Sequence, residues 1–534
     1  MNQQLIPKGL IILARIFIYD TTLRDGAQAE GISFSSEDKE EVLRRLDDFG
    51  MHFVEGGLPT SNPKDKEFFA SASKKKLKNT KLVAFGSTRR ADNPAEKDAG
   101  LKGLAECGAQ WICIFGKSWD FHVENALKVT LEENLSMVKE SVAFLKKHKK
   151  NVIFDAEHFF DGYRENERYA MNVLKAAVDG GADWIVLCDT NGGSLPSYVS
   201  DVVSNVVSQF RTPVGIHCHN DSDLAVACSL AAIDSGATMV HGTVNGIGER
   251  CGNANLCSII PNLMLKTGHE VPIDDLTKLT PLSHLVGEIA NITPPLNLPY
   301  VGKAAFAHKG GMHVSAITKD TRTYEHVPPL SVGNRRRVLI SEMSGRASIT
   351  EKLKELGLSD EDDVQEITDE IKALEAEGYQ FEGADASFEL LVKKLRNDID
   401  HPFNVVGFRL FIDEIGDKGL ISEASIKVMD RHGNVEHTAS DGDGPVNALD
   451  RALRKALMRF YPVLNNIRLT DYKVRVLDEK AATAAPVRVM IRSTDGTDSW
   501  TTVGVSQNVI EASLLALTDS IEYSILKNER RGSK

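Results

Sequence analysis

The sequence predicts a closed (β/α)8 barrel, followed by a helical linker subdomain and a C-terminal α+β domain. Three observations support this fold class. Apolar runs alternate with polar, helix-compatible segments through the first half of the chain, residues capable of chemistry follow the ends of these runs, and the tail repeats one strand and helix pattern. We expect the barrel to span residues 1–290, the linker 291–400 and the C-terminal domain 401–534.

The barrel prediction rests on the way helices give way to strands. Four helical segments end in a glycine that leads into an apolar run, as at Gly50 and Gly181. Glycine ends a helix by adopting the left-handed conformation, and the β-branched and aromatic residues that follow favour a buried strand. The expected strands are 15–20, 52–57, 81–86, 111–116, 151–157, 183–189, 213–219 and 239–245, and helical segments include 36–49, 131–149, 165–178 and 222–235. A doubly wound open sheet is the competing arrangement, but barrel active sites form at strand C-terminal ends, where these polar residues fall.

The linker and the tail differ from the barrel in composition. Five prolines interrupt residues 294–329, and 359–384 is typical of a charged amphipathic helix. In the tail, alternating runs at 405–413, 422–430 and 434–440 precede a helix near 445–460, and runs at 469–477, 486–494 and 498–505 precede another near 508–527. The tail has no dense cluster of catalytic residue types, so we expect it to have a binding or regulatory role.

Composition excludes several classes of protein. The chain has 534 residues, 42% of them hydrophobic and 26% charged, which excludes a disordered or collagen-like chain. Its net charge of −12 disfavours binding to nucleic acid or to an anionic membrane. No run of about 18 apolar residues and no export signal is seen, and the 7 cysteines form no CxxC pair. We therefore expect a cytoplasmic protein with reduced thiols and without a nucleic-acid or membrane partner.

A candidate metal site follows from the seventh and first strands. Strand side chains alternate between faces, so His217 and His219 point together into the barrel mouth while Cys218 points towards the helices. Asp25 follows the first strand and could complete a site of two imidazoles and one carboxylate for a divalent cation. The alternative for Asp25 is a helix N-cap in a surface ion pair.

Further candidates lie at the same rim. Arg24 precedes Asp25 and is placed to bind an anionic group of a substrate. A glycine-rich turn at 244–255 opens a helix, and Asn253 could add a neutral oxygen ligand. Its glycines do not match GxGxxG and follow the last strand, so we do not expect dinucleotide binding. Glu157 and Thr190 end strands five and six, where each could bind substrate or merely cap a helix.

Three motifs together carry a family resemblance. The segments DTTLRDGAQ at 20–28, HCHND at 217–221 and NGIGERCGN at 245–253 resemble those of the 2-isopropylmalate synthase, homocitrate synthase and citramalate synthase family of metal-dependent barrel acyltransferases. Segments 308–313 and 321–326 are most similar to the citramalate synthase branch. The resemblance covers the whole chain and implies a C-terminal regulatory domain of duplicated βββα units, a homodimer or higher homo-oligomer, and an amino-acid effector such as isoleucine.

The resemblance also implies roles for individual residues. The metal ligands that it implies are Asp25, His217, His219 and, more weakly, Asn253. The catalytic residues that it implies are Arg24, Glu157, His313 and Tyr324, with Arg24 and Thr190 contacting the substrate. His313 and Tyr324 come from the linker, which in this family often reaches across a dimer. Tyr300 is a nearby alternative to Tyr324.

The implied reaction is a Claisen-type condensation of acetyl-CoA with a 2-oxo acid and water, with a divalent ion such as Mg, Mn or Zn as cofactor. Branch resemblance favours pyruvate, which would give (R)-citramalate for isoleucine biosynthesis. The alternatives are 2-isopropylmalate synthase or homocitrate synthase activity, a metal-dependent acyl-CoA lyase, and a non-catalytic metabolite sensor. The long tail disfavours the lyase, and the intact set of candidate metal ligands disfavours the sensor.

Overall fold

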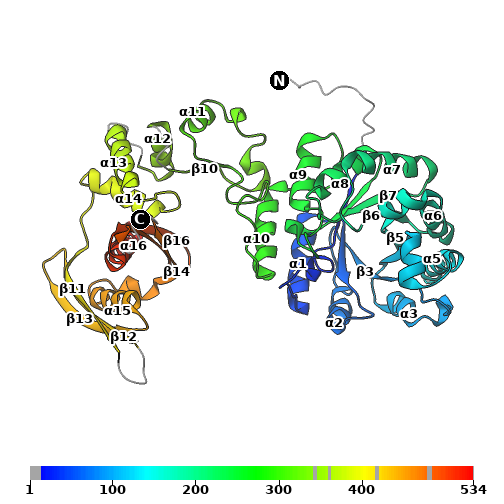
Figure 1. Cartoon of the computed structure of the whole chain (residues 1–534), viewed down its shortest axis with the longest axis horizontal. Helices are drawn as coiled ribbons and strands as arrows, with labels where there is room; N and C mark the ends of the chain where they lie inside the picture. Colours follow the sequence, from blue (N-terminus) through cyan, green and yellow to red (C-terminus); the bar gives the residue numbers. More distant parts are fainter. Residues whose placement is uncertain (1–13, 341–345, 359–362, 415–419, 478–483, 533–534) are drawn as a thin grey trace. The chain divides into compact units, whose positions relative to one another are not determined.

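The chain folds into two compact units (Figure 1). The structure is a computed structural model that describes residues 14–340, 346–358, 363–414, 420–477 and 484–532. The first unit comprises Met1–Phe306 with His326–Arg336, and the second comprises Ala307–Glu325 with Arg337–Lys534. Among the described residues, no helix has both the length and the apolar character that a membrane span requires.

The first unit is a closed barrel of eight parallel strands that pair in chain order. The strands are β1 (Phe17–Asp20), β2 (Phe53–Gly57), β3 (Lys81–Ser87), β4 (Trp111–Lys117), β5 (Asn151–Glu157), β6 (Trp184–Asp189), β7 (Val214–Cys218) and β8 (Met239–Gly242). β8 pairs with β1 through the register Phe17 to Met239, which closes the sheet. The predicted barrel is therefore confirmed, and the competing open sheet is wrong.

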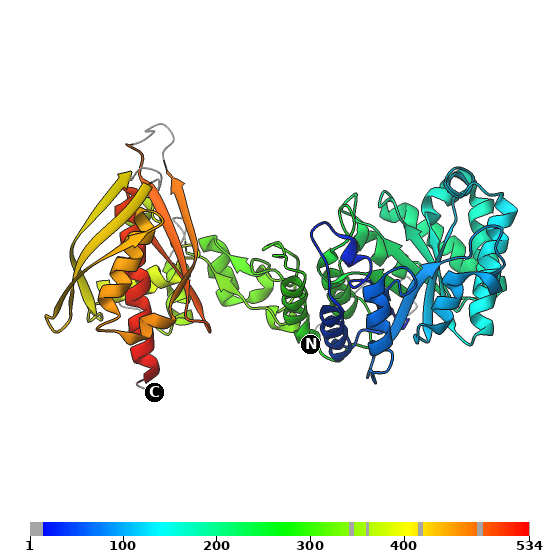
Figure 2. The ribbon, with the colours of Figure 1, turned by 90° about the horizontal axis from the view of Figure 1, so that it is seen from below.

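Helices surround this barrel (Figure 2). The main ones are α1 (Ser36–Phe49), α2 (Pro63–Ala72), α3 (Ala99–Glu106), α5 (Leu131–Lys147), α6 (Phe159–Gly180), α7 (Pro196–Gln209), α8 (Ala225–Asp234), α9 (Leu256–Lys266) and α10 (Leu279–Ile289). In α1, Ser35 and Asp38 form a reciprocal capping box, and Gly50 ends the helix at φ 99°. The capping box and the terminal glycine are local sequence signals for the two ends of α1. They explain why the helix predicted at 36–49 is confirmed.

Several elements of the barrel differ from their predicted bounds by one to six residues, and β8 and α6 are two of them. β8 ends at Gly242 because the returning chain passes close by, so a Cβ there would lie 2.3 Å from the carbonyl oxygen of Ala254. α6 starts at Phe159, earlier than predicted, and is kinked at Asn166, where φ is −147°. Both differences arise from tertiary contacts or backbone irregularities that hydrophobic periodicity does not report.

Aromatic rings close the N-terminal end of the barrel interior. Phe17, Phe53, Trp111 and Trp184 stand at or near the first positions of β1, β2, β4 and β6. The ring centroids of Phe17 and Trp184 lie 5.5 Å apart, and those of Phe53 and Trp111 lie 5.0 Å apart. The interior is thus a packed core with a solid floor, as is usual for this fold.

The second unit begins with a small two-stranded sheet and a group of helices. Its elements up to residue 395 are β9 (Ala307–His308), β10 (Arg337–Val338), α11 (Gly311–Lys319), α12 (Arg346–Glu355), α13 (Val364–Ala376) and α14 (Asp385–Leu395). The helix predicted at 359–384 is too long, because α13 ends at Ala376 and Gly378 follows at φ 107°. Residues 359–362 of that prediction lie outside the described part of the chain.

The rest of the second unit repeats one motif twice. The first copy contains β11 (Phe403–Glu414), β12 (Leu420–Asp430), β13 (Val435–Gly442) and α15 (Pro445–Leu457), and the second contains β14 (Arg468–Val476), β15 (Val487–Thr494), β16 (Ser499–Ser506) and α16 (Val509–Gly532). Each sheet is antiparallel, and Figure 2 shows both helices between the two sheets. The predicted duplicated βββα domain is confirmed.

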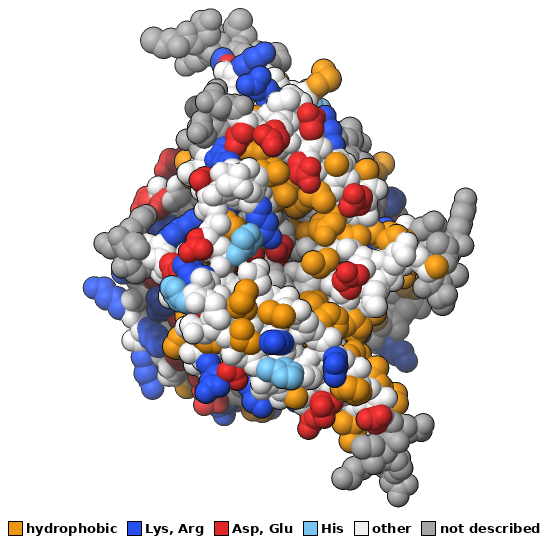
Figure 3. Space-filling model, turned by 90° about the vertical axis from the view of Figure 1, so that its left-hand side faces the viewer, with side chains coloured by type: hydrophobic (Ala, Val, Ile, Leu, Met, Phe, Trp, Pro, Cys, Tyr) orange, Lys and Arg blue, Asp and Glu red, His pale blue; other side chains and the backbone are white. Residues whose placement is uncertain are grey.

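The strands of this duplicated domain leave apolar side chains uncovered. Val406, Phe411 and Ile412 of β11 and Val474 of β14 are each about half exposed. Figure 3 shows hydrophobic areas of this kind between charged side chains on one face of the molecule. Exposed apolar areas of this sort are typical of interaction surfaces.

Candidate active site

A pocket of about 220 Å³ lies at the C-terminal ends of the barrel strands. This is the end at which barrel enzymes build their active sites. The pocket is lined by Arg24, Asp25, Gln28, Phe85, Phe115, Asp155, Glu157, Cys188, Thr190, His217, His219, Glu249 and Arg250. It therefore brings together the residues that the sequence placed on the first, fifth, sixth and seventh strands.

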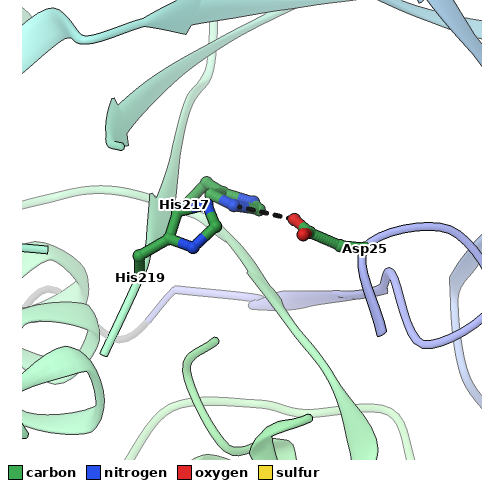
Figure 4. Close-up of side chains that lie close together, drawn as sticks. All are labelled: Asp25, His217 and His219. Carbon is green, nitrogen blue, oxygen red and sulfur yellow. Dashed lines mark ion pairs between the residues drawn. The ribbon is translucent and has the colours of Figure 1, made fainter. Parts of the chain in front are cut away.

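Asp25, His217 and His219 point towards one another in this pocket (Figure 4). One ligand atom from each lies within 4.8 Å of the other two, and Nε2 of His217 is 3.3 Å from Oδ2 of Asp25. All three side chains are buried. Nδ1 of each histidine has no hydrogen-bond partner among the described residues. Two imidazoles and a carboxylate around one centre are a donor set for a divalent transition metal.

Local backbone geometry places these ligands. After β1 the chain turns tightly, because the amides of Arg24, Asp25 and Gly26 all donate to the carbonyl oxygen of Thr21. His217 lies on β7 and His219 just beyond its end, and their ring centroids are 5.2 Å apart. The predicted alternation of faces therefore holds.

Asn253 is the neighbour of His219 across a short antiparallel bridge. Its side chain is buried, and its Oδ1 atom has no hydrogen-bond partner within the described ranges. Gly252 makes this approach possible, because its φ is 88° and a Cβ would lie 2.0 Å from the carbonyl oxygen of Gly246. The glycine-rich turn thus presents a neutral oxygen beside the imidazoles.

The electrostatics of Asp25 and His219 suit a cation. Burial raises the pKa of Asp25, but the charge of Arg24 and the hydrogen bond from His217 outweigh it and hold the pKa well below the usual value. Burial, followed by the charge on His217, lowers the pKa of His219 to about 4. For His217, burial lowers the pKa, but the hydrogen bond and charge of Asp25 raise it above the ordinary value overall. An ionised carboxylate and a neutral imidazole are the forms that bind a metal.

Arg24 is held rigidly beside this cluster. Its Nε lies 2.5 Å from Oε2 of Glu55, and its Nη1 lies 3.4 Å from Oδ2 of Asp25. Its guanidinium carbon lies 4.0 Å from the ring centroid of Phe85, and the hydroxyl of Tyr19 donates to the other oxygen of Glu55. Sequence reasoning missed Glu55, although an acidic residue inside the apolar run of β2 was an available indication.

Glu157 and Thr190 stand on neighbouring strands of the rim. Glu157 forms an ion pair with Lys117, its register partner on β4. The hydroxyl oxygen of Thr190 accepts the backbone N–H of His158 at 2.8 Å. Both side chains line the pocket.

His313 and Tyr324 belong to the second unit, so the pocket of the first unit is built without them. Their rings stack with centroids 4.1 Å apart and an interplanar angle of 28°. The Tyr324 side chain is 47% exposed, whereas Tyr300 is buried and its hydroxyl donates to Asn262. The exposed tyrosine stacked on a histidine is the better candidate for contact with a substrate.

Known protein families match nearly the whole chain. A family model described as HMGL-like matches residues 15–286, and one described as homocitrate synthase post-HMGL domain-like matches 300–379. The LeuA allosteric (dimerisation) domain matches residues 382–525. The order of these three matched domains along the chain agrees with the family that the sequence motifs resemble.

Curated relatives narrow the family further. A protein named (R)-citramalate synthase from Aquifex aeolicus is 54% identical over 97% of this chain and 99% of its own length. One of the same name from Geobacter sulfurreducens is 52% identical over 98% of this chain and 100% of its own. The chain belongs to the citramalate synthase family. A 2-isopropylmalate synthase from Methanocaldococcus jannaschii is more distant, at 32% identity over 98% of the chain and 97% of its own length.

Proposed function

We propose that the chain condenses acetyl-CoA with pyruvate and water to give (R)-citramalate and CoA, as a step towards isoleucine. The observation that carries this proposal is the full-length similarity to proteins named (R)-citramalate synthase, combined with a pocket that contains the candidate ligands and Arg24. The reaction joins the methyl carbon of the acetyl group to the keto carbon of pyruvate. Hydrolysis of the thioester then releases CoA.

Asp25, His217 and His219 would hold a divalent cation such as Mg, Mn or Zn, with Asn253 as a weaker oxygen ligand. Nδ1 of His219 and Oδ1 of Asn253 are buried without partners among the described residues, and Nε2 of His217 lies beside Asp25, which supports this fit. A bound cation supplies Lewis acidity, which polarises the keto group of a 2-oxo acid.

Arg24 would stabilise the oxygen on which negative charge develops. Its position is fixed by Glu55 and Phe85 before the reaction starts, so little reorganisation is needed when the alkoxide forms. A contact that strengthens as charge develops lowers the barrier more than one that binds substrate and transition state equally. Thr190 would contact the oxo acid from the next part of the rim.

The acetyl methyl group must lose a proton that is far less acidic than any side chain. His313 and Tyr324 would act as a pair, hydrogen-bonding the thioester oxygen while one of them mediates proton removal. Their stacked rings and the exposure of Tyr324 support this assignment. Glu157, paired with Lys117, would assist proton transfer or activate the hydrolytic water.

Aromatic walls favour a small oxo acid. Phe85 and Phe115 line the pocket with their rings stacked, at a centroid distance of 5.4 Å and an interplanar angle of 19°. Lying against the side chain of the oxo acid, these rings would favour the methyl group of pyruvate over a branched side chain. Discrimination of this kind is worth roughly 1–3 kcal/mol per methylene group.

A panel of oxo acids tests the proposal. Free CoA would be measured with a thiol reagent after mixing the full-length chain with acetyl-CoA and pyruvate, 2-oxobutyrate, 2-oxoisovalerate or 2-oxoglutarate. We expect pyruvate to give the highest kcat/KM and chiral chromatography to identify (R)-citramalate. Preference for 2-oxoisovalerate or 2-oxoglutarate would instead assign a 2-isopropylmalate synthase or homocitrate synthase activity.

The duplicated C-terminal domain would form a homodimer and bind an amino-acid effector such as isoleucine. Its match to an allosteric dimerisation domain and its exposed apolar strand residues support this assignment.

A further inference from the structure

A second cluster of buried polar side chains lies inside the barrel and shares His217 with the first. Asp155 of β5, His217 of β7 and His241 of β8 each place one ligand atom within 4.8 Å of the other two. Their side chains are nearly inaccessible, at 4%, 5% and 0% exposure. Asp155 also lines the pocket, so the cluster adjoins the site where the cation would bind.

Polar atoms in this cluster lack partners. Oδ1 of Asp155, Nδ1 of His217 and both ring nitrogens of His241 form no hydrogen bond with the described residues. Burying a polar atom without a partner is costly, so such groups in native proteins are normally satisfied by one another or by water. One ligand atom of each residue lies within 4.8 Å of the others, a separation that one water or a small side-chain shift can bridge.

The two ring nitrogens of His217 have different surroundings. Nε2 lies 3.3 Å from Asp25, on the side of the candidate ligands, and Nδ1 remains for a different partner. A histidine that binds a metal almost always donates its other N–H to a carboxylate, a carbonyl or a water, which fixes its tautomer and ring orientation. Asp155 is the carboxylate in the cluster that shares His217.

We propose that Asp155 is a positioning residue for the cation: its carboxylate accepts the Nδ1–H of His217, directly or through one water, and so directs Nε2 towards the cation. The assignment rests on the cation site of the proposed function. His241 completes the cluster, stacked on Tyr19 with centroids 3.8 Å apart.

Zinc binding tests the proposal without reference to turnover. The full-length chain would be stripped with a chelator, and Zn²⁺ alone would be titrated in competition with a chromophoric chelator. We expect Asp155→Ala to weaken zinc binding about 10- to 100-fold, as for other residues that orient a ligating histidine. Asp155→Asn keeps an acceptor oxygen, so we expect a smaller loss. Both variants should bind one zinc per chain.

Asp20→Asn is the matched control. Asp20 is a buried carboxylate of β1 that accepts from the backbone N–H and the hydroxyl of Thr22 and belongs to neither histidine cluster. We expect its substitution to leave the zinc affinity unchanged. A loss equal to that of Asp155→Ala would show that burial of a carboxylate, and not its place beside His217, controls the affinity, and would overturn the proposal.

Three other outcomes would overturn it. These are wild-type zinc affinity in Asp155→Ala, two zinc ions per wild-type chain, and the failure of the wild-type chain to bind zinc, magnesium or manganese. If Asp155→Ala does not fold, the rise in Tm on adding zinc is compared for Asp155→Asn and the wild type, and an equal rise counts against the proposal. Zinc binding that depends on Asp155 in a chain that turns over no oxo acid would overturn the proposed reaction and leave this assignment intact.

Discussion

Nε of Arg24 lies 2.5 Å from Oε2 of Glu55, and the Glu55 side chain is fully buried. Glu55 lies on β2, and Arg24 lies in the turn that follows β1, the strand that pairs with β2 in the barrel. Tyr19 donates to the second oxygen of Glu55. An arginine proposed to act on substrate is therefore anchored to the barrel core before any substrate binds.

Replacing Glu55 by Gln should destabilise the fold. The change removes the nearer of two carboxylates beside the buried Arg24 and leaves only Asp25, at 3.4 Å, and breaking such a buried pair costs on the order of 3–5 kcal/mol. Urea unfolding followed by circular dichroism measures the loss. The control is Glu41→Gln, which removes the partner of the exposed Arg44 and Arg45 on α1, where surface pairs contribute about 0–1 kcal/mol. Equal stability of the two variants would contradict the role assigned to Glu55.

Arg24→Ala should lower kcat by about 10²-fold or more, as for loss of other groups that stabilise an oxyanion. Arg24→Lys should rescue little, because one ammonium group cannot reproduce the planar contacts with Glu55 and Asp25. Steady-state kinetics with pyruvate and acetyl-CoA measures both variants. A near wild-type kcat in Arg24→Ala would remove this residue from the mechanism.

His217→Ala should lose bound metal. The purified wild type and variant would be compared by elemental analysis, and chelation of the wild type should abolish CoA release until Mg²⁺, Mn²⁺ or Zn²⁺ is restored. His148→Ala serves as the control, because His148 is exposed at the end of α5 and lies outside the candidate metal clusters. Full metal retention in His217→Ala would contradict its assignment as a ligand.

The barrel and much of its site were predictable because their signals are local. Apolar runs mark the strands, glycine stops precede four of them, and closure of the barrel then brings the ends of distant strands together. Alternation along β7 was sufficient to aim His217 and His219 at one centre with Asp25. The sequence therefore indicated the site before any coordinates did.

Other residues could not be found in this way. Glu55 and Asp155 stand inside apolar strands, and their partners come from other elements of the barrel. The Phe85 and Phe115 walls are likewise indistinguishable from ordinary core residues until the pocket is seen. The role of such a residue depends on which strands become neighbours in the fold. No local sequence pattern encodes that arrangement.

His313→Ala and Tyr324→Phe should each lower kcat by about 10²- to 10⁴-fold, the range typical of general acid–base groups. Zinc affinity should stay unchanged, because neither residue belongs to the candidate metal clusters. Tyr300→Phe is the control, since it loses only a hydrogen bond to Asn262 and should retain kcat. Wild-type turnover in Tyr324→Phe would exclude its hydroxyl from proton transfer.

Isoleucine should lower activity when titrated against the full-length chain. Coupling between separate sites typically changes an apparent affinity about 5- to 150-fold. Leucine is the matched control, because it has the same atoms with a different branch point. The apparent KM for each substrate and the sedimentation coefficient would be followed together. Indifference to both amino acids would leave the duplicated domain as a dimerisation element.

The aromatic floor of the barrel has a consequence for the order of events. The packed rings of Phe17, Phe53, Trp111 and Trp184 close the N-terminal end of the barrel. Substrates and products of the pocket must therefore enter and leave at the C-terminal ends of the strands. The 2-oxo acid would bind next to the histidines. Acetyl-CoA, which is much larger, would then bind over it and cover it. We therefore expect the 2-oxo acid to bind before acetyl-CoA, and CoA to leave before citramalate.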